Sequence, residues 1–220
     1  MPKLNSIRAR RVALASLCAL PLASSAAMAV TASPALARAQ IAKKKKKSKS
    51  FTVKVKSGTL TIAFTSTAWA SLSGGNTAVG TATTPTGAAT STPTGSFSFP
   101  ITGGTLNSAS GQGTVASSGG FTISRHLNVS FFESSSTASA ENPTASLGKS
   151  SSLILNSANF TPPRVPLFQL STAHVKVIGS KSAVTLNQIP ATLTPAGLQF
   201  FGSSFKAGVT VATVTILAKG

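Results

Sequence analysis

Short segments in which apolar residues alternate with serine or threonine recur along the chain, and this period of two most constrains its fold. The segment GGFTISRHLNVSFFE, from Gly119 to Glu133, shows the pattern most fully. Its apolar positions fall on one face of an extended strand, interrupted by Arg125, while its polar positions, His126 among them, fall on the other. Because a helix would need a period near 3.6, the chain is predicted to be built mainly of strands.

Similar segments begin at residue 51 and continue to the end of the chain, separated by turns rich in Gly and Ser. Short strands at such spacing predict an all-β fold, mainly antiparallel, arranged as a sandwich or a barrel. The stretch 76–96 is rich in Thr, Gly and Pro and is predicted to be a loop. The predicted strands are FTVKVK, GTLTIAF, SFSFPITGG, GQGTVAS, GFTISRHLNVSFF, SSLIL, VPLFQL, AHVKVIG, SAVTL and VTVATVTIL.

A first short helix is predicted near residues 66–73, directly after the strand GTLTIAF. Thr65 or Ser66 can cap its N-terminus, and Trp69 and Leu72 lie three positions apart on one side. A lone tryptophan of this kind either lines a ligand pocket or anchors the core, and the core is the favoured interpretation.

A second short helix is predicted near residues 195–201. Thr194 is its expected cap, and Pro195 is its expected first residue because proline fits the first helical turn. Leu198 and Phe201 are predicted to point inward as a pair. The two helices complete the prediction of one β domain over residues 51–220.

The first 39 residues are predicted to be an export signal. A positive start containing Lys3 and Arg8 is followed by the apolar stretch VALASLCALPLASSAAMAV and by ALARA, which offers small residues for cleavage. Cleavage there would remove Cys18 and both methionines, so the mature chain is expected to be secreted without thiols or disulfides. General secretion and twin-arginine export both remain open.

A run of lysines follows the signal, and residues 40–50 are predicted to form a basic, disordered linker. The run either contacts an anionic surface of the cell envelope or serves as a solvated leash. Nucleic acid is a disfavoured partner because the chain lacks clusters of aromatic and basic residues that would stack on bases. The lysines of this tract are Lys43, Lys44, Lys45, Lys46, Lys47 and Lys49.

Acidic residues are nearly absent, and this excludes most classes of enzyme. The chain has 20 Lys and Arg residues against 2 Asp and Glu residues, a formal net charge of +18. Glu133 and Glu141 are the only carboxylates, so paired-acid catalysis, a Ser-His-Asp triad and calcium or magnesium sites are disfavoured. The protein is therefore predicted to be a binding or structural protein and not an enzyme.

Several of these segments together resemble the HtaA domain family of exported, β-rich domains from actinobacteria, many of which bind haem at the cell surface. The likeness covers roughly residues 57–217, and its most specific parts are GTVASSGGFTISRH and LTPAGLQFFGSSFKAG. It implies the same fold and a haem site in which a tyrosine ligates the iron and a histidine supports it. His126 stands where the family's histidine follows its strand.

This chain departs from the family pattern in having no tyrosine, and Trp69 or a neighbour occupies the tyrosine's place. Iron in haem takes His, Met, Cys or Tyr as its protein ligand, so the mature chain offers only His126 and His174. Arg125 could pair with a haem propionate, although neighbours on a strand face opposite sides unless a bulge intervenes.

The alternative for His126 is an ordinary surface position on a half-exposed strand. The alternative for Arg125 is a position near the end of its strand, from which its side chain reaches water. Two functions follow as hypotheses: a secreted module that binds haem or a similar flat apolar ligand, and a structural or adhesive envelope protein that has lost the haem site.

Overall fold

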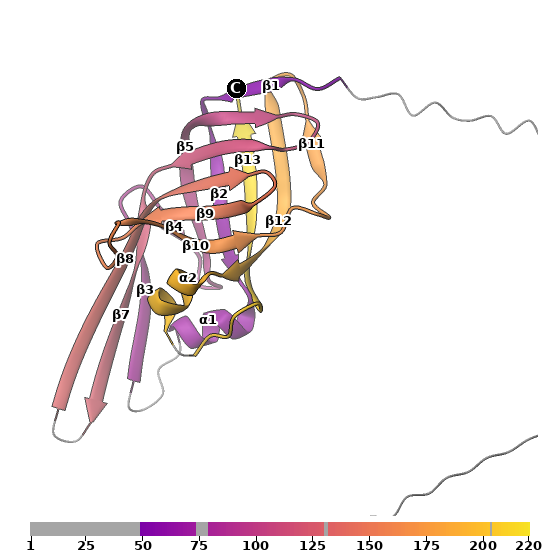
Figure 1. Ribbon diagram of the computed structural model, residues 1–220. Coiled ribbons are helices and arrows are strands. Elements are labelled where there is room, and N and C mark those ends of the chain that lie inside the picture. The colour runs from indigo at the N-terminus through magenta and orange to yellow at the C-terminus, as the bar shows by residue number, and fades with distance from the viewer. Residues whose placement is uncertain (1–48, 74–78, 130–131, 203) are drawn as a thin grey trace, which may run out of the picture. The chain divides into compact units, whose positions relative to one another are not determined.

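The computed structural model describes residues 49–73, 79–129, 132–202 and 204–220, with side chains described throughout except at 79–82, 126–129 and 132–135 (Figure 1). The predicted export signal and the tract residues before Lys49 lie outside these ranges. The described chain is mostly antiparallel β-structure with two short helices, which confirms the predicted fold class. Neither described helix is long and apolar enough to cross a lipid bilayer.

Eight strands close into a barrel. The ring is completed by β6, which pairs with β5 on one side and with β8 on the other. Around the ring the order is β5 (Ser96–Asn107), β2 (Ser57–Phe64), β13 (Thr210–Lys219), β12 (Ala183–Leu193), β10 (Arg164–Leu170), β9 (Ser151–Asn156), β8 (Phe132–Leu147) and β6 (Gly113–Ser117).

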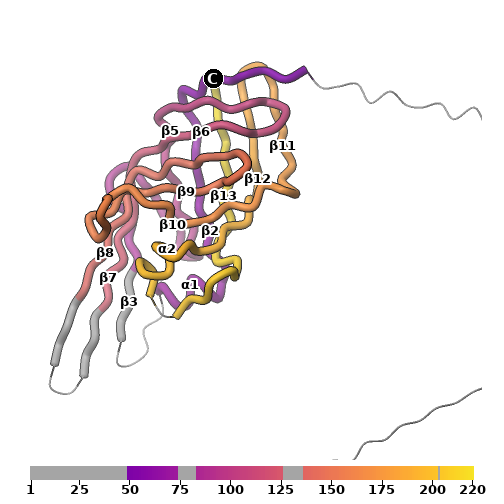
Figure 2. The backbone as a smooth tube through the Cα atoms, viewed as in Figure 1, coloured from indigo at the N-terminus to yellow at the C-terminus, as the bar shows by residue number. Residues whose placement is uncertain are grey.

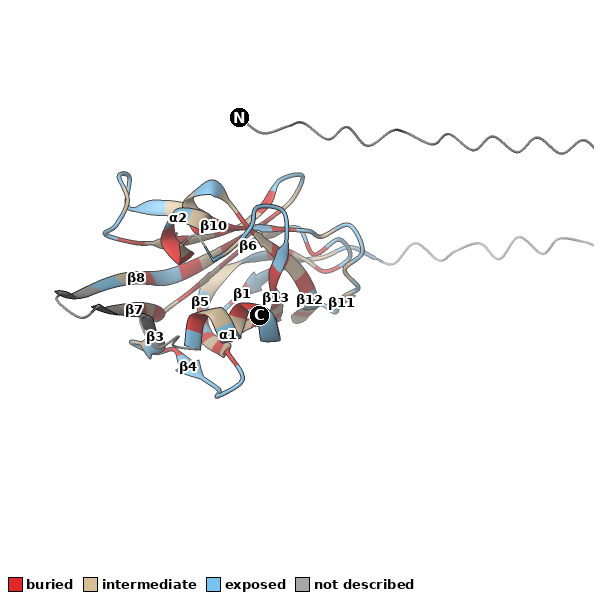
Figure 3. Cartoon of the chain, turned by 90° about the horizontal axis from the view of Figure 1, so that it is seen from below, coloured by how far each residue is buried: buried red, intermediate tan, exposed pale blue. Residues whose placement is uncertain are grey.

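The interior of the barrel is filled by the apolar residues of the alternating pattern. Alternate residues of β2 from Leu60 to Phe64 and of β5 from Phe97 to Ile101 are buried, while their neighbours are half-buried or exposed. Figure 3 shows this alternation of buried and exposed positions along the strands. The residues that are completely buried include Leu60, Ile62, Phe97, Phe99, Val115, Leu153, Leu155, Phe168, Val184, Val214 and Ile216.

Five further strands extend or flank the barrel. β7 (Gly120–Val129) pairs with the first part of β8 on one side and with β3 (Val79–Thr86) on the other. Figure 2 shows these three strands leaving the barrel together as a ribbon. The short strands β1 (Thr52–Val55), β4 (Thr90–Ser91) and β11 (Val177–Gly179) pair with β5, β5 and β12, respectively.

The prediction of a loop over residues 76–96 was wrong, and β8 was not predicted. About half of that stretch is strand, because β3 and β4 lie within it. Both β3 and β8 are rich in Ser, Thr and Ala, so they lack the apolar alternation that identifies a strand. The strand structure of β3 and of the first part of β8 is set by backbone pairing with β7, which carries the pattern, and that of the second part of β8 by pairing with β6 and β9.

Both helices lie together at one end of the barrel (Figure 1), and their positions confirm the prediction. α1 (Ser66–Ser73) follows β2, and α2 (Pro195–Phe201) follows β12. In α1 Leu72 is fully buried and Trp69 only partly. In α2 the buried side chains are those of the adjacent Phe200 and Phe201, whereas Leu198 is partly buried, so the predicted inward pair is half correct.

Replacement of Gly95 by alanine is expected to lower the free energy of unfolding by about 2–4 kcal/mol. Gly95 has a φ of 80°, which L-residues adopt at a cost, and a Cβ there would overlap the Trp69 ring. Urea unfolding followed by fluorescence of the chain's 1 tryptophan measures the change. Gly103→Ala is the matched control, because a Cβ at Gly103 meets nothing within 4 Å; equal effects of the two changes would contradict the interpretation.

Candidate functional site

The helical end of the barrel begins at Thr65, where β2 passes into α1. The Thr65 N–H donates to the Val211 carbonyl of β13 (2.8 Å), which ties the start of α1 to the barrel wall. Its hydroxyl accepts from the Ala68 N–H (3.2 Å) and caps the helix, as predicted. α1 is therefore held against the barrel by its first residues and by the burial of Leu72.

Trp69 projects from α1 onto the wall formed by β5. Its indole N–H donates to the Pro93 carbonyl (2.9 Å), and its ring meets the Phe97 ring edge-on at 5.9 Å between centroids. The close approach of Gly95 leaves no room for the indole to move in that direction. The only polar atom of Trp69 is thus satisfied by backbone, and its partial burial against the core fits the predicted anchoring role.

α2 is fixed at its start by Thr194 and ends at Gly202. The Thr194 hydroxyl accepts from the Gly197 N–H (3.0 Å), and Pro195 occupies the first helical turn, which confirms both predictions. At the other end the Gly202 N–H donates to the Leu198 carbonyl (2.8 Å) with a φ of 91° at Gly202. The last carbonyls of the helix then need other donors.

Arg125 supplies those donors from β7. Its Nη2 donates to the carbonyl of Phe200 (3.2 Å) and to that of Phe201. A cation at the C-terminus of a helix is favoured by the helix dipole as well as by hydrogen bonds. This contact explains why an arginine interrupts the apolar row of β7: the side chain is half-buried and bonds α2 instead of reaching water at the strand end.

A cluster of phenylalanines joins α2 to β7 beneath this contact. Phe121 of β7 stacks on Phe201 at 6.1 Å with the ring planes 24° apart, and Phe200 meets Phe121 edge-on at the same distance. Phe160, from the connection between β9 and β10, stacks on the other side of Phe200 at 6.4 Å. The sequence analysis did not single out Phe160, because its Pro-rich connection carries no periodic pattern.

A hollow of about 270 Å³ opens beside Arg125, between β7, β8 and α2. It combines one guanidinium with aromatic surface and with several neutral polar side chains. No carboxylate side chain shares it among the described residues, since Glu141 lies opposite Gly120, farther along β7. The lining residues are Ile123, Arg125, Ser136, Thr137, Ala138, Asn159, Phe160, Gln199 and Phe200.

A second, larger groove of about 400 Å³ lies on the other side of the helical end, between α1 and the segment that leads into β13. Ala68, Phe205 and Val211 give it apolar walls, and Lys206 stands at its edge. Among the residues whose side chains are described, no His, Cys, Met or Tyr lines either hollow. Within the described part of the chain, no three His, Cys, Asp or Glu residues come together as a metal site.

The two histidines of the predicted mature chain lie in different parts of the fold. His126 follows Arg125 in β7, where its backbone is opposite Ser135 of β8 and Gly80 of β3; its side chain lies outside the described set. His174 is exposed in a turn between β10 and β11, not in the predicted strand, because only Val177–Gly179 of that segment pairs with β12. The structure therefore separates His174 from both hollows.

Comparisons with known proteins agree with this architecture. The family profile Htaa matches residues 66–217. The C-terminal domain of HtaA from Corynebacterium glutamicum aligns with a TM-score of 0.57 and 16% identity over 76% of this chain and 98% of that domain. The N-terminal domain of the same protein aligns with a TM-score of 0.52 and 14% identity over 76% of this chain and 98% of that domain.

A further solved structure, the haem-binding protein HtaB of Corynebacterium glutamicum, aligns with a TM-score of 0.49 and 15% identity over 78% of this chain and 96% of that one. A search of curated proteins gives no match. At 16% and 14% identity, the two HtaA domains show that the fold is shared, and they say nothing about which residues of this chain bind a ligand.

Arg125→Met is expected to lower the free energy of unfolding by about 1–2 kcal/mol, because the last carbonyls of α2 lose their donors and the favourable cation. Arg164→Met is the control: that guanidinium bonds only the hydroxyl of Thr144, at an exposed position (2.9 Å). Its effect should stay within about 0.5 kcal/mol. Chemical denaturation of both variants measures the difference, and equal losses would mean that Arg125 does not hold α2.

Proposed function

Because the chain belongs to the HtaA family, we propose that it is an exported module that binds haem or a similar flat, apolar ligand. The proposed site is the hollow beside Arg125 at the helical end of the barrel, where β7 meets α2. Export is proposed from the signal-like first 39 residues. Such a module would act outside the membrane, at or near the cell surface.

The observation that carries this proposal is the half-buried Arg125 guanidinium beside aromatic rings. Guanidinium has five N–H donors, whereas the described hydrogen bonds of Arg125 all come from Nη2. The remaining donors suit a carboxylate, which arginine binds in a forked geometry. The rings of Phe160 and Phe200 border the same hollow and offer apolar contact to a flat molecule.

The size of the hollow limits how such a ligand would sit. Pockets that enclose a drug-sized molecule usually measure ~300–1,000 Å³. The hollow beside Arg125, at about 270 Å³, falls just below that range. A porphyrin would therefore be held by its carboxylate edge and by one face against the phenylalanines, with the rest of the macrocycle exposed.

The described residues supply contacts for the macrocycle but no ligand for iron. The family likeness puts the ligating tyrosine in the segment of α1, and Trp69, whose indole cannot ligate iron, stands there. With 0 tyrosines in the chain, histidine is the remaining ligand type in the predicted mature protein. His126 is the proposed ligand because the family likeness assigns its histidine to this position, whereas His174 lies in a turn away from the hollow. Because β7 pairs regularly with β3 and β8 at Arg125 and His126, these two residues lie on opposite faces of the strand, so a haem that uses both would have to reach beyond the hollow.

A structural or adhesive envelope protein is the second candidate function, and the fixed position of Trp69 favours it. The indole N–H is bonded to Pro93, and the ring packs on Phe97, so the segment that should carry the iron ligand serves the core. In that case the fold is kept and iron is not bound. The two candidates differ in whether the purified protein changes the spectrum of haemin.

Addition of haemin to residues 40–220 is expected to give a shifted Soret band, which His126→Ala abolishes, weakening binding by at least about tenfold. His174→Ala should leave the band nearly unchanged. Since only neutral imidazole ligates iron, the shift should weaken as the pH falls below ~6.5, the ordinary histidine pKa. Absorption titrations at pH 5.5 and 7.5 measure this, with circular dichroism as the control for folding.

Metal-free protoporphyrin separates ligation from binding of the macrocycle. If the hollow holds the porphyrin, metal-free protoporphyrin should quench the fluorescence of Trp69 in the parent and in His126→Ala alike. No spectral shift and no quenching in the parent would overturn the binding proposal and leave the structural function. Quenching without a shift would assign the site to flat ligands other than haem.

A further inference from the structure

Lysines gather at the end of the barrel opposite the helices, a surface named the basic end here. β1 lies across this end with Val53 and Val55 buried and its alternate residues facing outward. The Lys56 N–H donates to the Lys219 carbonyl (2.8 Å), which brings the end of β1 to the end of β13. The lysines of the basic end are Lys49, Lys54, Lys56, Lys181 and Lys219, all of them exposed.

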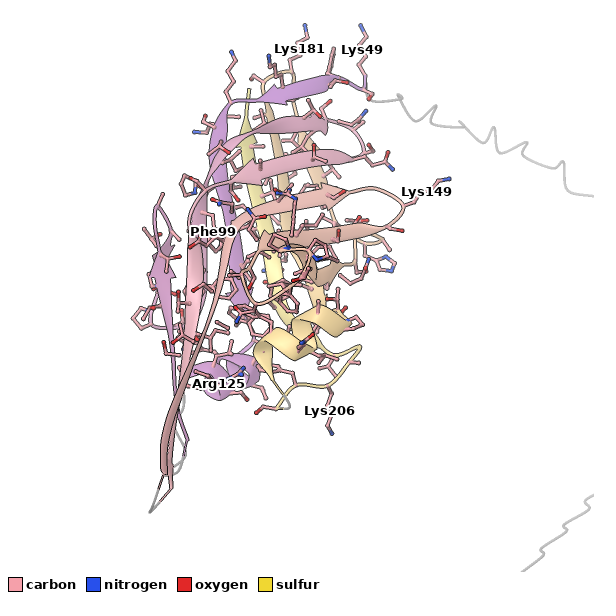
Figure 4. The ribbon with its side chains drawn as sticks, turned by 60° about the vertical axis from the view of Figure 1, so that its left-hand side comes forward. Lys49, Phe99, Arg125, Lys149, Lys181 and Lys206 are labelled. Carbon is pink, nitrogen blue, oxygen red and sulfur yellow. The ribbon has the colours of Figure 1, made fainter. Side chains whose placement is uncertain are left out.

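Figure 4 shows the separation of this surface from the helical end: Lys49 and Lys181 stand beside β1, while Arg125 and Lys206 lie at the far end. The turn that carries Lys181 is held close to β1, because its ammonium lies 5.6 Å from the centre of the Phe51 ring. The basic end is therefore one continuous surface contributed by three separate parts of the chain.

Among the described residues, no acidic side chain neutralises the positive charge of the basic end. Glu141, the one carboxylate side chain among the described residues, lies in β8 opposite Asn156 of β9 and away from β1. None of the hollows described above is lined by these lysines. The charge of this surface is therefore spread over exposed side chains outside the described hollows, which suits an extended anionic partner and not a small anion.

Exposed apolar side chains accompany this charge. Large hydrophobic residues that are clearly exposed in the described structure are Ile178, Val209 and Leu217, and the first and last of these stand near the basic end. Ile178 and Leu217 are each paired with Thr185, so they share the outer face of β11, β12 and β13. Leu217 lies two residues before Lys219 in β13, so the two side chains lie on the same face of that strand.

We infer that the basic end is a docking surface for an anionic lipid membrane. Lysines act on lipid headgroups as point charges, each contributing to attraction near the surface, and no arginine fork for a specific phosphate is present among the described residues of this end. Ile178 and Leu217 add apolar contact at the level of the headgroups, which a soluble polyanion would not use. The combination favours a membrane over a polymer.

The lysine tract precedes Lys49 in the sequence, and Lys49 belongs to the basic end, so the tract would add positive charge to the docking proposed here. Docking through this end leaves the helical end, with the hollow beside Arg125, facing away from the membrane (Figure 1). The inference does not depend on haem binding, since the two ends share no residues.

Vesicle binding tests the inference with residues 40–220, which contain the lysine tract and the whole of the closed barrel. Vesicles of 30% phosphatidylglycerol in phosphatidylcholine should bind the protein, pure phosphatidylcholine should not, and 0.5 M NaCl should release it. Lys54→Gln with Lys56→Gln is expected to weaken binding by about tenfold or more. Lys149→Gln with Lys206→Gln removes the same charge elsewhere and should change it by less than about threefold.

Equal losses from the two double variants would overturn the inference, because net charge alone would then explain binding. No loss from Lys54→Gln with Lys56→Gln would overturn it too and assign attachment to the tract. Circular dichroism of each variant confirms that the fold is kept.

A membrane is distinguished from a soluble polymer by the apolar residues. Ile178→Ser with Leu217→Ser should weaken binding to the anionic vesicles by about fivefold but leave binding to long-chain polyphosphate unchanged; Val209→Ser, at the helical end, is the control. Binding to polyphosphate with no binding to vesicles would replace the lipid by a polymeric partner. If Ile178→Ser with Leu217→Ser leaves vesicle binding unchanged, the proposed surface is also contradicted.

Discussion

The pairing of β6 with both β5 and β8 is the interaction on which the rest of the structure depends. Without it the sheet would stay open, with Ile101–Leu106 of β5 and Thr144–Leu147 of β8 left without a partner strand on that side, and an unpaired edge can pair with another chain. Closure also encloses the apolar side chains of the alternating pattern. The chain has no disulfide to hold it, so this enclosed core must supply the stability.

Closure leaves the two ends of the barrel to be covered by other parts of the chain, and it is there that the molecule becomes asymmetric. One end is covered by α1 and α2, which bring phenylalanines and the Arg125 contact together. The other is crossed by β1, whose outward residues are polar and basic. The proposed ligand site and the proposed membrane surface thus use opposite ends of one rigid framework.

Arg125 links stability and function at the helical end. The same guanidinium holds the last carbonyls of α2 and borders the hollow beside Phe160 and Phe200. A ligand that accepts hydrogen bonds from the remaining N–H donors of Arg125 would therefore contact the same side chain that bonds the last carbonyls of α2. Trp69 has no such double role, because its N–H and its ring are both engaged with β5 and the connection before it.

The sequence by itself determined the fold class, the two helices with Thr65 and Thr194 as caps, and most strands, because period-two patterns and capping residues act locally. It did not predict β3, which is rich in Thr, or β8, which is rich in Ser, Thr and Ala; these segments become strands by pairing with β7 and, in the second half of β8, with β6 and β9. It named Arg125 as a site residue but could not place it on α2, which is 75 residues away along the chain. Which lysines share the basic end with Lys49 was likewise decided by tertiary structure, since Lys54, Lys181 and Lys219 come to one end of the barrel only when strand pairing brings together β1, the β11–β12 turn and the end of β13.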